Sequence, residues 1–88
     1  MQRFEFIEDV EAWVEPMGYD TFWQAIEPYG IFGPEDRAHC DRTLADGIAP
    51  MDTVMAVTKG MFCMEMTLAH DLRIRPTPRP SPRLEVIN

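Results

Sequence analysis

Residues 51–72 read MDTVMAVTKGMFCMEMTLAHDL, and this stretch decides the fold because it predicts one long helix. Pro50 and Asp52 favour a helix start, and a helix over 51–72 is roughly 33 Å long at about 1.5 Å per residue. Its apolar side chains cover roughly 200° of the helix circumference. They are Met51, Val54, Met55, Val57, Met61, Phe62, Met64, Met66, Leu68, Ala69 and Leu72. The pattern therefore predicts a central helix that other segments must cover.

A stripe of small residues runs beside this apolar arc. It consists of Ala56, Gly60, Cys63 and Thr67. Small residues at spacings of three and four allow a second backbone to come close, and methionine side chains adapt to varied shapes. We expect self-association or a partner contact through Ala56, Gly60, Met61, Phe62, Met64 and Glu65. The alternative is a central helix wrapped entirely by its own chain.

Glu65 lies near the middle of the apolar arc, where a carboxylate needs an explanation. An unpaired buried charge is costly, so the side chain must be paired, protonated or directed at a partner. We expect an ion pair with an arginine of the same or a neighbouring chain. A polar residue that specifies an interface, or a catalytic acid, is the alternative.

Three shorter helices are predicted upstream of residue 51. From Ile7 the apolar spacing is helical, with Glu8, Glu11 and Glu15 on the opposite side, until Pro16 and Gly18 stop it. A second helix over 21–27 begins after Asp20, which is a good N-cap, and it buries Phe22, Trp23 and Ile26. The third starts at Pro34, which suits the first helical position, and runs to about residue 46 with Gly47 beyond its end.

The chain after residue 72 is of a different kind. Proline at 76, 78, 80 and 82 forbids a helix and favours an extended conformation. Residues 84–87 could add a short strand, with the alternating residues 2–6 as its partner. The predicted fold is all-α: a small domain of three to four helices over 1–72, with short extended termini and a proline- and arginine-rich arm over 73–88.

The charge is divided between these two parts. Residues 1–71 hold fourteen acidic and four basic side chains, a net charge of −10, whereas residues 72–88 carry +3. A body of this charge repels nucleic acid and attracts basic surfaces, so we expect no direct nucleic-acid binding. We expect Arg75, Arg79 and Arg83 to dock the arm on the acidic body or on a neighbouring subunit.

Two sets of acidic residues form the predicted partner-binding patch. The first is the stripe of Glu8, Glu11 and Glu15, and the second is Glu35, Asp36 and Asp41 in the third helix. Such a patch complements a basic surface on another protein. The alternative is a solvated face that keeps the protein soluble.

The spacing of potential catalytic and metal-binding residues argues against an enzyme. His39, Cys40, Cys63, Glu65 and His70 are the potential ligands, yet no CxxC, HxxxH or HExxH spacing occurs. The five glycines are scattered, and only one lysine is present. We expect no catalytic residues, no cofactor and no metal, with both cysteines reduced. Charged residues interrupt every apolar run, so we also expect no signal peptide, no membrane span and a cytoplasmic protein.

These observations predict a non-enzymatic protein-binding module. The leading hypothesis is an acidic inhibitor that occupies the nucleic-acid-binding surface of a partner, as anti-CRISPR proteins and phage inhibitors of host nucleases do. The alternative is an accessory subunit of an oligomeric assembly, held by the Met-rich helix and the arm. A small metal-dependent enzyme or sensor is the third hypothesis.

Overall fold

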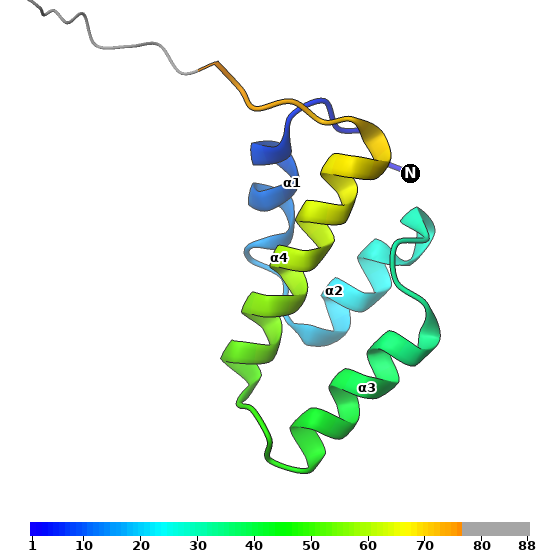
Figure 1. Ribbon diagram of the computed structural model, residues 1–88, viewed down its shortest axis with the longest axis vertical. Coiled ribbons are helices and arrows are strands. Elements are labelled where there is room, and N and C mark those ends of the chain that lie inside the picture. Colours follow the sequence, from blue (N-terminus) through cyan, green and yellow to red (C-terminus); the bar gives the residue numbers. More distant parts are fainter. Residues whose placement is uncertain (77–88) are drawn as a thin grey trace, which may run out of the picture.

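The computed structural model describes residues 1–76, and this part is helical (Figure 1). The elements are α1 (Ile7–Val14), α2 (Tyr19–Ile26), the 3-10 helix η1 (Glu27–Tyr29), α3 (Pro34–Ala45) and α4 (Met51–His70). No strand occurs within residues 1–76. The predicted small all-α domain, with one long helix after three shorter ones, is confirmed. The predicted strand over 84–87 lies outside the described residues.

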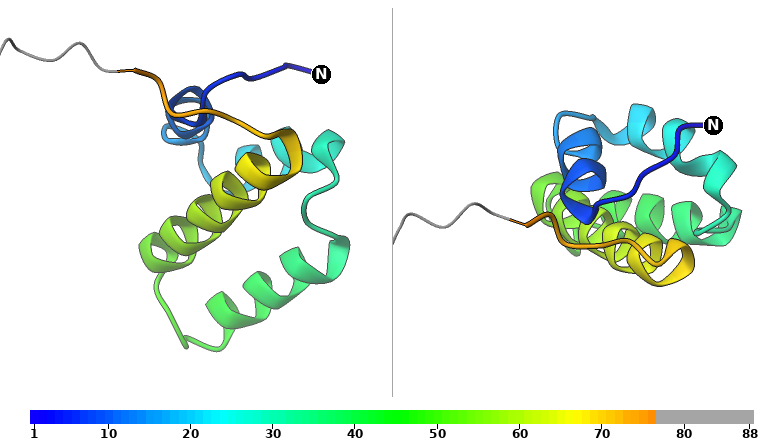
Figure 2. Two further views of the ribbon diagram at one scale, coloured as in Figure 1. Left: turned by 45° about the horizontal axis from the view of Figure 1, so that its top comes forward. Right: turned by 90° about the horizontal axis from the view of Figure 1, so that it is seen from above.

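The helices lie in two layers that cross. Seen from above, α1 and α2 lie on one side of the molecule, and α3 and α4 lie on the other (Figure 2). The C-terminal half of α4 packs against α1, while α3 runs beside the N-terminal half of α4 (Figure 1). One face of α4 therefore points to the other helices, and its opposite face has no neighbour within residues 1–76.

The ends of α3 follow the signals in the sequence. Pro34 stands at the first helical position, and the Asp36 carboxylate accepts a hydrogen bond of 2.8 Å from the Gly33 amide. At the other end Gly47 has φ +69°, a left-handed conformation that glycine adopts without strain. The Gly47 amide donates a hydrogen bond to the Leu44 carbonyl, and the Ile48 amide donates one to the Thr43 carbonyl. These two carbonyls at the end of the helix are therefore satisfied.

Two predicted helix ends need correction. Gly18, and not Asp20, is the N-cap of α2, so this helix begins two residues before the predicted start. Asp20 lies in the first turn, where its carboxylate accepts a hydrogen bond of 2.5 Å from Arg37 of α3. The prediction missed this because a capping residue and a first-turn acid both favour the positive end of a helix. At its C-terminus α4 stops at His70, where Asp71 adopts φ +52°.

Phe62 forms the centre of the core. Its side chain is 0 % exposed. Its ring centroid lies 5.9 to 6.5 Å from those of Trp13, Phe22, Tyr29 and Phe32. Because these four aromatic residues come from α1, α2, η1 and the loop before α3, one α4 side chain joins all the preceding segments.

The two ends of the described chain are joined by backbone hydrogen bonds. The Ile7 amide donates to the Arg73 carbonyl at 2.8 Å, and the Arg73 amide donates to the Glu5 carbonyl at 3.0 Å. This parallel bridge places residues 72–75 beside the start of α1 (Figure 1). In the part of the chain that is described, α4 included, no helix has both the length and the hydrophobicity to cross a membrane.

Candidate functional site

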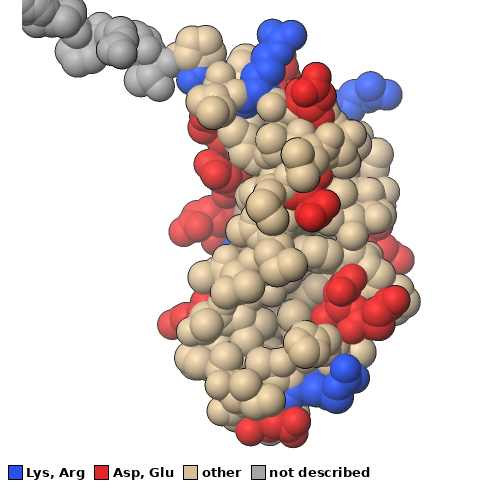
Figure 3. Space-filling view, in the orientation of Figure 1, with Lys and Arg blue, Asp and Glu red and all other residues tan. Residues whose placement is uncertain are grey.

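The outward face of α4 is apolar and exposed. Val57, Met61, Met64 and Leu68 are 55, 48, 56 and 73 % exposed, respectively. Their spacing of four, three and four residues places them in one line along the helix. Figure 3 shows a mostly uncharged surface over α4, with acidic side chains gathered along the edge over α1. A contiguous apolar line on a small protein is typical of an interaction surface.

Phe62 does not belong to this exposed face, although the sequence placed it in the interface set. It is fully buried in the core, so its side chain is not available to a partner. The predicted arc of 200° was treated as a single surface, whereas the fold divides it into a buried and an exposed half. Of the other predicted interface residues, Ala56, Gly60, Met61, Met64 and Glu65 are all exposed.

Glu65 also differs from its expected environment. The side chain is exposed, and within residues 1–76 it forms no ion pair. Water therefore solvates the carboxylate, and no buried partner is needed. The expected burial of Glu65 is therefore wrong, and no arginine within residues 1–76 pairs with it; an ion pair with a neighbouring chain stays a prediction.

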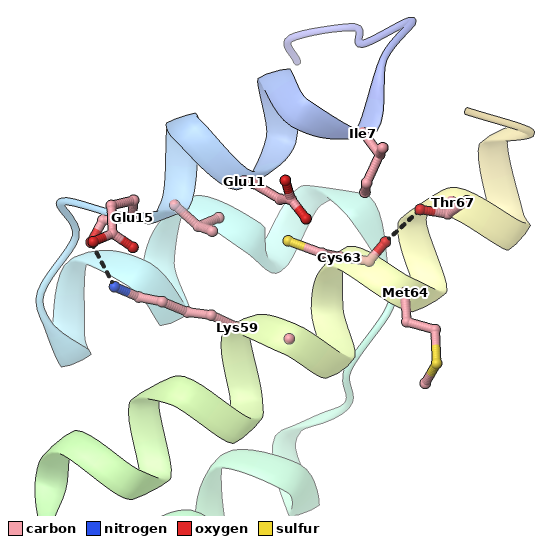
Figure 4. A pocket seen from close by; sticks show the side chains of 9 residues that line it. Ile7, Glu11, Glu15, Lys59, Cys63, Met64 and Thr67 are labelled. Carbon is pink, nitrogen blue, oxygen red and sulfur yellow. Dashed lines mark hydrogen bonds between the residues drawn. The ribbon is translucent and has the colours of Figure 1, made fainter. Parts of the chain in front are cut away.

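A groove of about 340 Å³ lies between α1 and α4, next to the exposed face. It is lined by Ile7, Glu11, Val14, Glu15, Lys59, Gly60, Cys63, Met64 and Thr67. Glu11 and Glu15 contribute carboxylates from α1, whereas Gly60 and Met64 belong to α4 (Figure 4). The groove thus brings acidic residues of α1 together with the apolar face of α4.

Lys59 of α4 is hydrogen-bonded to the backbone that follows α1, at one end of this groove. Its Nζ donates hydrogen bonds to the backbone carbonyls of Glu15 at 2.9 Å and Met17 at 2.8 Å (Figure 4). These carbonyls follow the last turn of α1, where a cation is electrostatically favourable. The ammonium therefore holds the end of α1 against α4 and forms no ion pair with Glu11 or Glu15, although its positive charge lies at the same end of the groove as Glu15.

Cys63 lies in the groove with its thiol directed at α1 (Figure 4). Burial, together with the nearby Glu11 charge, raises the pKa of this thiol to about 11. The thiol stays protonated at neutral pH, so it is a poor nucleophile and a poor metal ligand. Its contribution to the site is to fill space.

Gly60 lies within the continuous helix α4, and no packing contact inside the described chain requires a glycine there. A Cβ added at this position would have no atom within 4 Å. Glycine within a helix costs about 1 kcal/mol relative to alanine, so this residue weakens α4 without any gain from internal packing. Because Gly60 has no side chain, the α4 backbone is exposed on this side of the groove.

The acidic residues do not form one patch. Glu8 and Glu11 lie on α1 and Glu15 is its C-cap, whereas Glu35, Asp36 and Asp41 lie on α3. Figure 1 shows these two helices beside opposite ends of α4. The predicted combined patch is therefore divided into two.

The acids of α3 are in part used within the fold. Asp36 caps its own helix, and the Asp41 carboxylate accepts a hydrogen bond of 2.6 Å from the Tyr19 hydroxyl. Burial, followed by that hydrogen bond, raises the pKa of Tyr19. Arg37 lies 3.9 Å from the same carboxylate. Only the α1 acids adjoin the apolar groove, which makes α1 the stronger candidate edge.

The first residues of the arm dock on α1. The Arg75 guanidinium lies 2.6 Å from the Asp9 carboxylate, and the Arg75 amide donates to Glu8 at 2.9 Å. The same guanidinium lies over the Phe6 ring, 4.4 Å from its centroid. Arg73 lies 3.8 Å from Glu5. The described start of the arm therefore contacts the acidic body, while Arg79 and Arg83 lie outside the described residues.

The potential metal ligands are not brought together within residues 1–76. No group of three or more His, Cys, Asp or Glu side chains is placed to hold a metal ion there. Cys40 approaches Thr58 with 3.7 Å between Sγ and Oγ1, and His70 packs edge-on against Tyr29. These contacts belong to the packing of the helices.

Comparisons of the chain with protein-family models, with curated proteins and with solved structures found no match. Functional inference therefore depends on the geometry described above. The sequence did not identify Val57 and Leu68 as part of the site, although their spacing with Met61 and Met64 was a usable signal. Asp9 was also missed, because nothing in its local sequence indicates that Arg75 contacts it.

Proposed function

We propose that this chain is a non-enzymatic protein-binding module that occupies a basic surface of a partner protein. The observation that supports it best is the position of Glu11 and Glu15 beside the exposed apolar line of α4. Charged residues steer association and select the partner, whereas buried apolar contacts supply much of the affinity. A surface with both features fits a partner that presents arginine or lysine next to aliphatic side chains.

The most common basic surfaces of this kind bind nucleic acid. The body of this chain carries a net charge of −10 over residues 1–71, so it can compete with phosphate groups for such a surface. In this proposal the chain is an inhibitor of a nucleic-acid-binding protein, of the anti-CRISPR or phage anti-host type. It needs no cofactor and does not bind nucleic acid itself.

The test is affinity capture of the tagged chain from host lysate at low and high salt. We compare the wild type with Glu11→Gln/Glu15→Gln and with a matched control, Glu27→Gln/Asp46→Asn, that changes the net charge equally at exposed positions outside both acidic sets. A basic partner recovered at low salt, lost at high salt and lost with the α1 variant alone supports the proposal. Equal loss with both variants would mean that overall charge, and not the α1 edge, is responsible.

An accessory subunit of an oligomeric assembly is the second candidate. It is favoured by the exposure of Met61, Met64 and Leu68, which apolar contact with a second copy would cover. Small domains often gain stability in this way. Light scattering measures the mass in solution. A salt-stable oligomer that Met61→Ser/Met64→Ser converts to single chains would favour this candidate, and a single chain at micromolar concentration would exclude self-association.

A further inference from the structure

The groove between α1 and α4 has an acidic edge and an apolar floor, and one segment of this chain has the complementary character. Residues 77–88 contain Arg79 and Arg83, followed by the aliphatic Leu84, Val86 and Ile87 with Glu85 among them. We propose that this segment of the same chain occupies the α1–α4 groove. Arg79 pairs with Glu15, and the aliphatic side chains that follow cover Met61 and Met64.

The described start of the arm shows how such pairing works. Arg75 binds Asp9 through its guanidinium and Glu8 through its backbone amide, and its side chain stacks on Phe6. Charge-assisted hydrogen bonds of this kind are stronger than neutral ones. The arm is thus fixed at the first turn of α1, with the remaining acids of the same helix further along.

The spacing of the arginines in the arm is similar to the spacing of the glutamates along α1. Glu8, Glu11 and Glu15 share one side of α1, and seven residues of helix span about 10 Å. Arg75, Arg79 and Arg83 recur every four residues, which is about 12 Å in an extended proline-rich chain at about 3.1 Å per residue. The Arg75 amide is bonded to Glu8 and its guanidinium to Asp9, so Arg79, about 12 Å further along the arm, is within reach of Glu15.

The length of the segment is sufficient. Residues 77–88 span up to about 37 Å when extended, whereas the exposed line from Val57 to Leu68 is about 16 Å long. Tethering also matters, because a short linker gives a segment an effective concentration in the millimolar range. Weak contacts to the groove are therefore enough to keep it occupied.

Charge argues against a second copy as the occupant. Two copies whose α4 helices meet antiparallel would bring their Glu11 and Glu15 edges together, and in any arrangement both bodies carry a net charge of −10. Like charges placed opposite each other are repulsive. Residues 77–88, with two arginines and Glu85, carry a net charge of +1 and are attracted to this edge.

The occupied groove has a consequence for binding that rests on the proposed function. A basic partner must displace the arm before it reaches Glu11 and Glu15, so the arm competes with that partner for the same carboxylates. Occupancy itself does not depend on any partner. It is therefore tested on the isolated full-length chain, separately from the capture experiment.

The test is NMR of the full-length chain, labelled with ¹⁵N and ¹³C, at low salt. We compare the wild type with Arg79→Gln/Arg83→Gln and with Arg3→Gln/Arg42→Gln, which changes the net charge equally at other exposed positions. The proposal predicts that the arm variant shifts the amide signals of Glu11, Glu15, Gly60 and Met64, and that the control leaves them in place. Contacts between the methyl groups of Leu84 or Ile87 and those of Met61 or Met64 disappear in the arm variant.

Two results would overturn the proposal. Unchanged groove signals in the arm variant, with no methyl contacts in the wild type, would show that the segment does not occupy the groove. Contacts seen only between labelled and unlabelled chains in a mixed sample would assign the arm to a neighbouring copy. A Leu84→Ser/Val86→Ser/Ile87→Ser variant separates the apolar contribution, because it should weaken the methyl contacts while leaving the arginines in place.

Discussion

The two faces of α4 are similar in composition but differ in what surrounds them. The inner face carries Phe62 and Met66, and aromatic side chains from the preceding segments enclose it. The outer face carries Met61 and Met64, and within residues 1–76 nothing covers it. Hydrophobicity alone therefore does not make a helix face part of the core. The aromatic side chains of the neighbours decide which face is buried, and the other face is left for a different contact.

The largest expected effect is a difference in the free energy of unfolding between variants of two adjacent residues, Phe62 and Met61. Phe62→Ala removes the central ring of the core and should lower the free energy of unfolding by about 3–5 kcal/mol. Met61→Ala on the outer face should change it by at most about 0.5 kcal/mol, because that side chain is exposed. Urea denaturation followed by circular dichroism measures both. A comparable loss in the two variants would contradict the division of α4 into two faces.

A smaller effect on the free energy of unfolding is expected at alkaline pH, and it comes from the buried Cys63 thiol of the inner face. Burial raises the pKa of Cys63 from 9.0 to about 11, so the folded state keeps the thiol protonated where the unfolded state ionises it. The free energy of unfolding should be constant below pH 9 in respect of this group. It should fall between pH 9 and 11 by roughly 2–3 kcal/mol and then level off.

The control for this pH effect is Cys63→Ala, followed by the same denaturation series. Burial also raises the pKa values of Tyr19 and Tyr29, so a decline in the free energy of unfolding above pH 10 should remain in the variant, while the part between pH 9 and 10 should be lost. Identical pH profiles for the wild type and the variant would show that the thiol is as well solvated in the folded state as in the unfolded one.

The smallest expected effect is a gain of stability on the outer face. Gly60→Ala adds a methyl group where no atom lies within 4 Å, and it favours the helix. The free energy of unfolding should rise by about 0.5–1 kcal/mol. Thermal denaturation detects this as a higher melting temperature. A loss of stability in the full-length chain would instead indicate that a segment approaches the Gly60 backbone closely, and this outcome would sharpen the assignment of the groove.

Much of the fold could be predicted because its signals are local. Pro34 and Gly47 mark the two ends of α3 through their own backbone preferences, which no distant residue needs to support. The start of α2 was misplaced because Asp20 is equally suited to two neighbouring positions. Local chemistry therefore predicted which elements exist better than where they begin.

The candidate site was harder to predict because it depends on contacts between distant residues. Glu11 and Glu15 were identified from their spacing, but only the packing of α1 on α4 places them beside Gly60 and Met64. In the same way, the apolar periodicity placed Phe62 and Met61 on one surface. In the structure the aromatic neighbours bury Phe62 and leave Met61 exposed. The ion pair of Arg75 with Asp9 spans 66 positions, and no sequence pattern announces it.

The hydrogen bonds of Lys59 can be followed by chemical labelling of its amine. It is the only lysine in the chain, and its ammonium is held by two carbonyl oxygens behind the last turn of α1. An amine-acylating reagent reaches this nitrogen only when those two bonds are broken. The rate at which the side chain is acylated, relative to that of a freely exposed lysine, therefore reports how often the Lys59 ammonium leaves the end of α1.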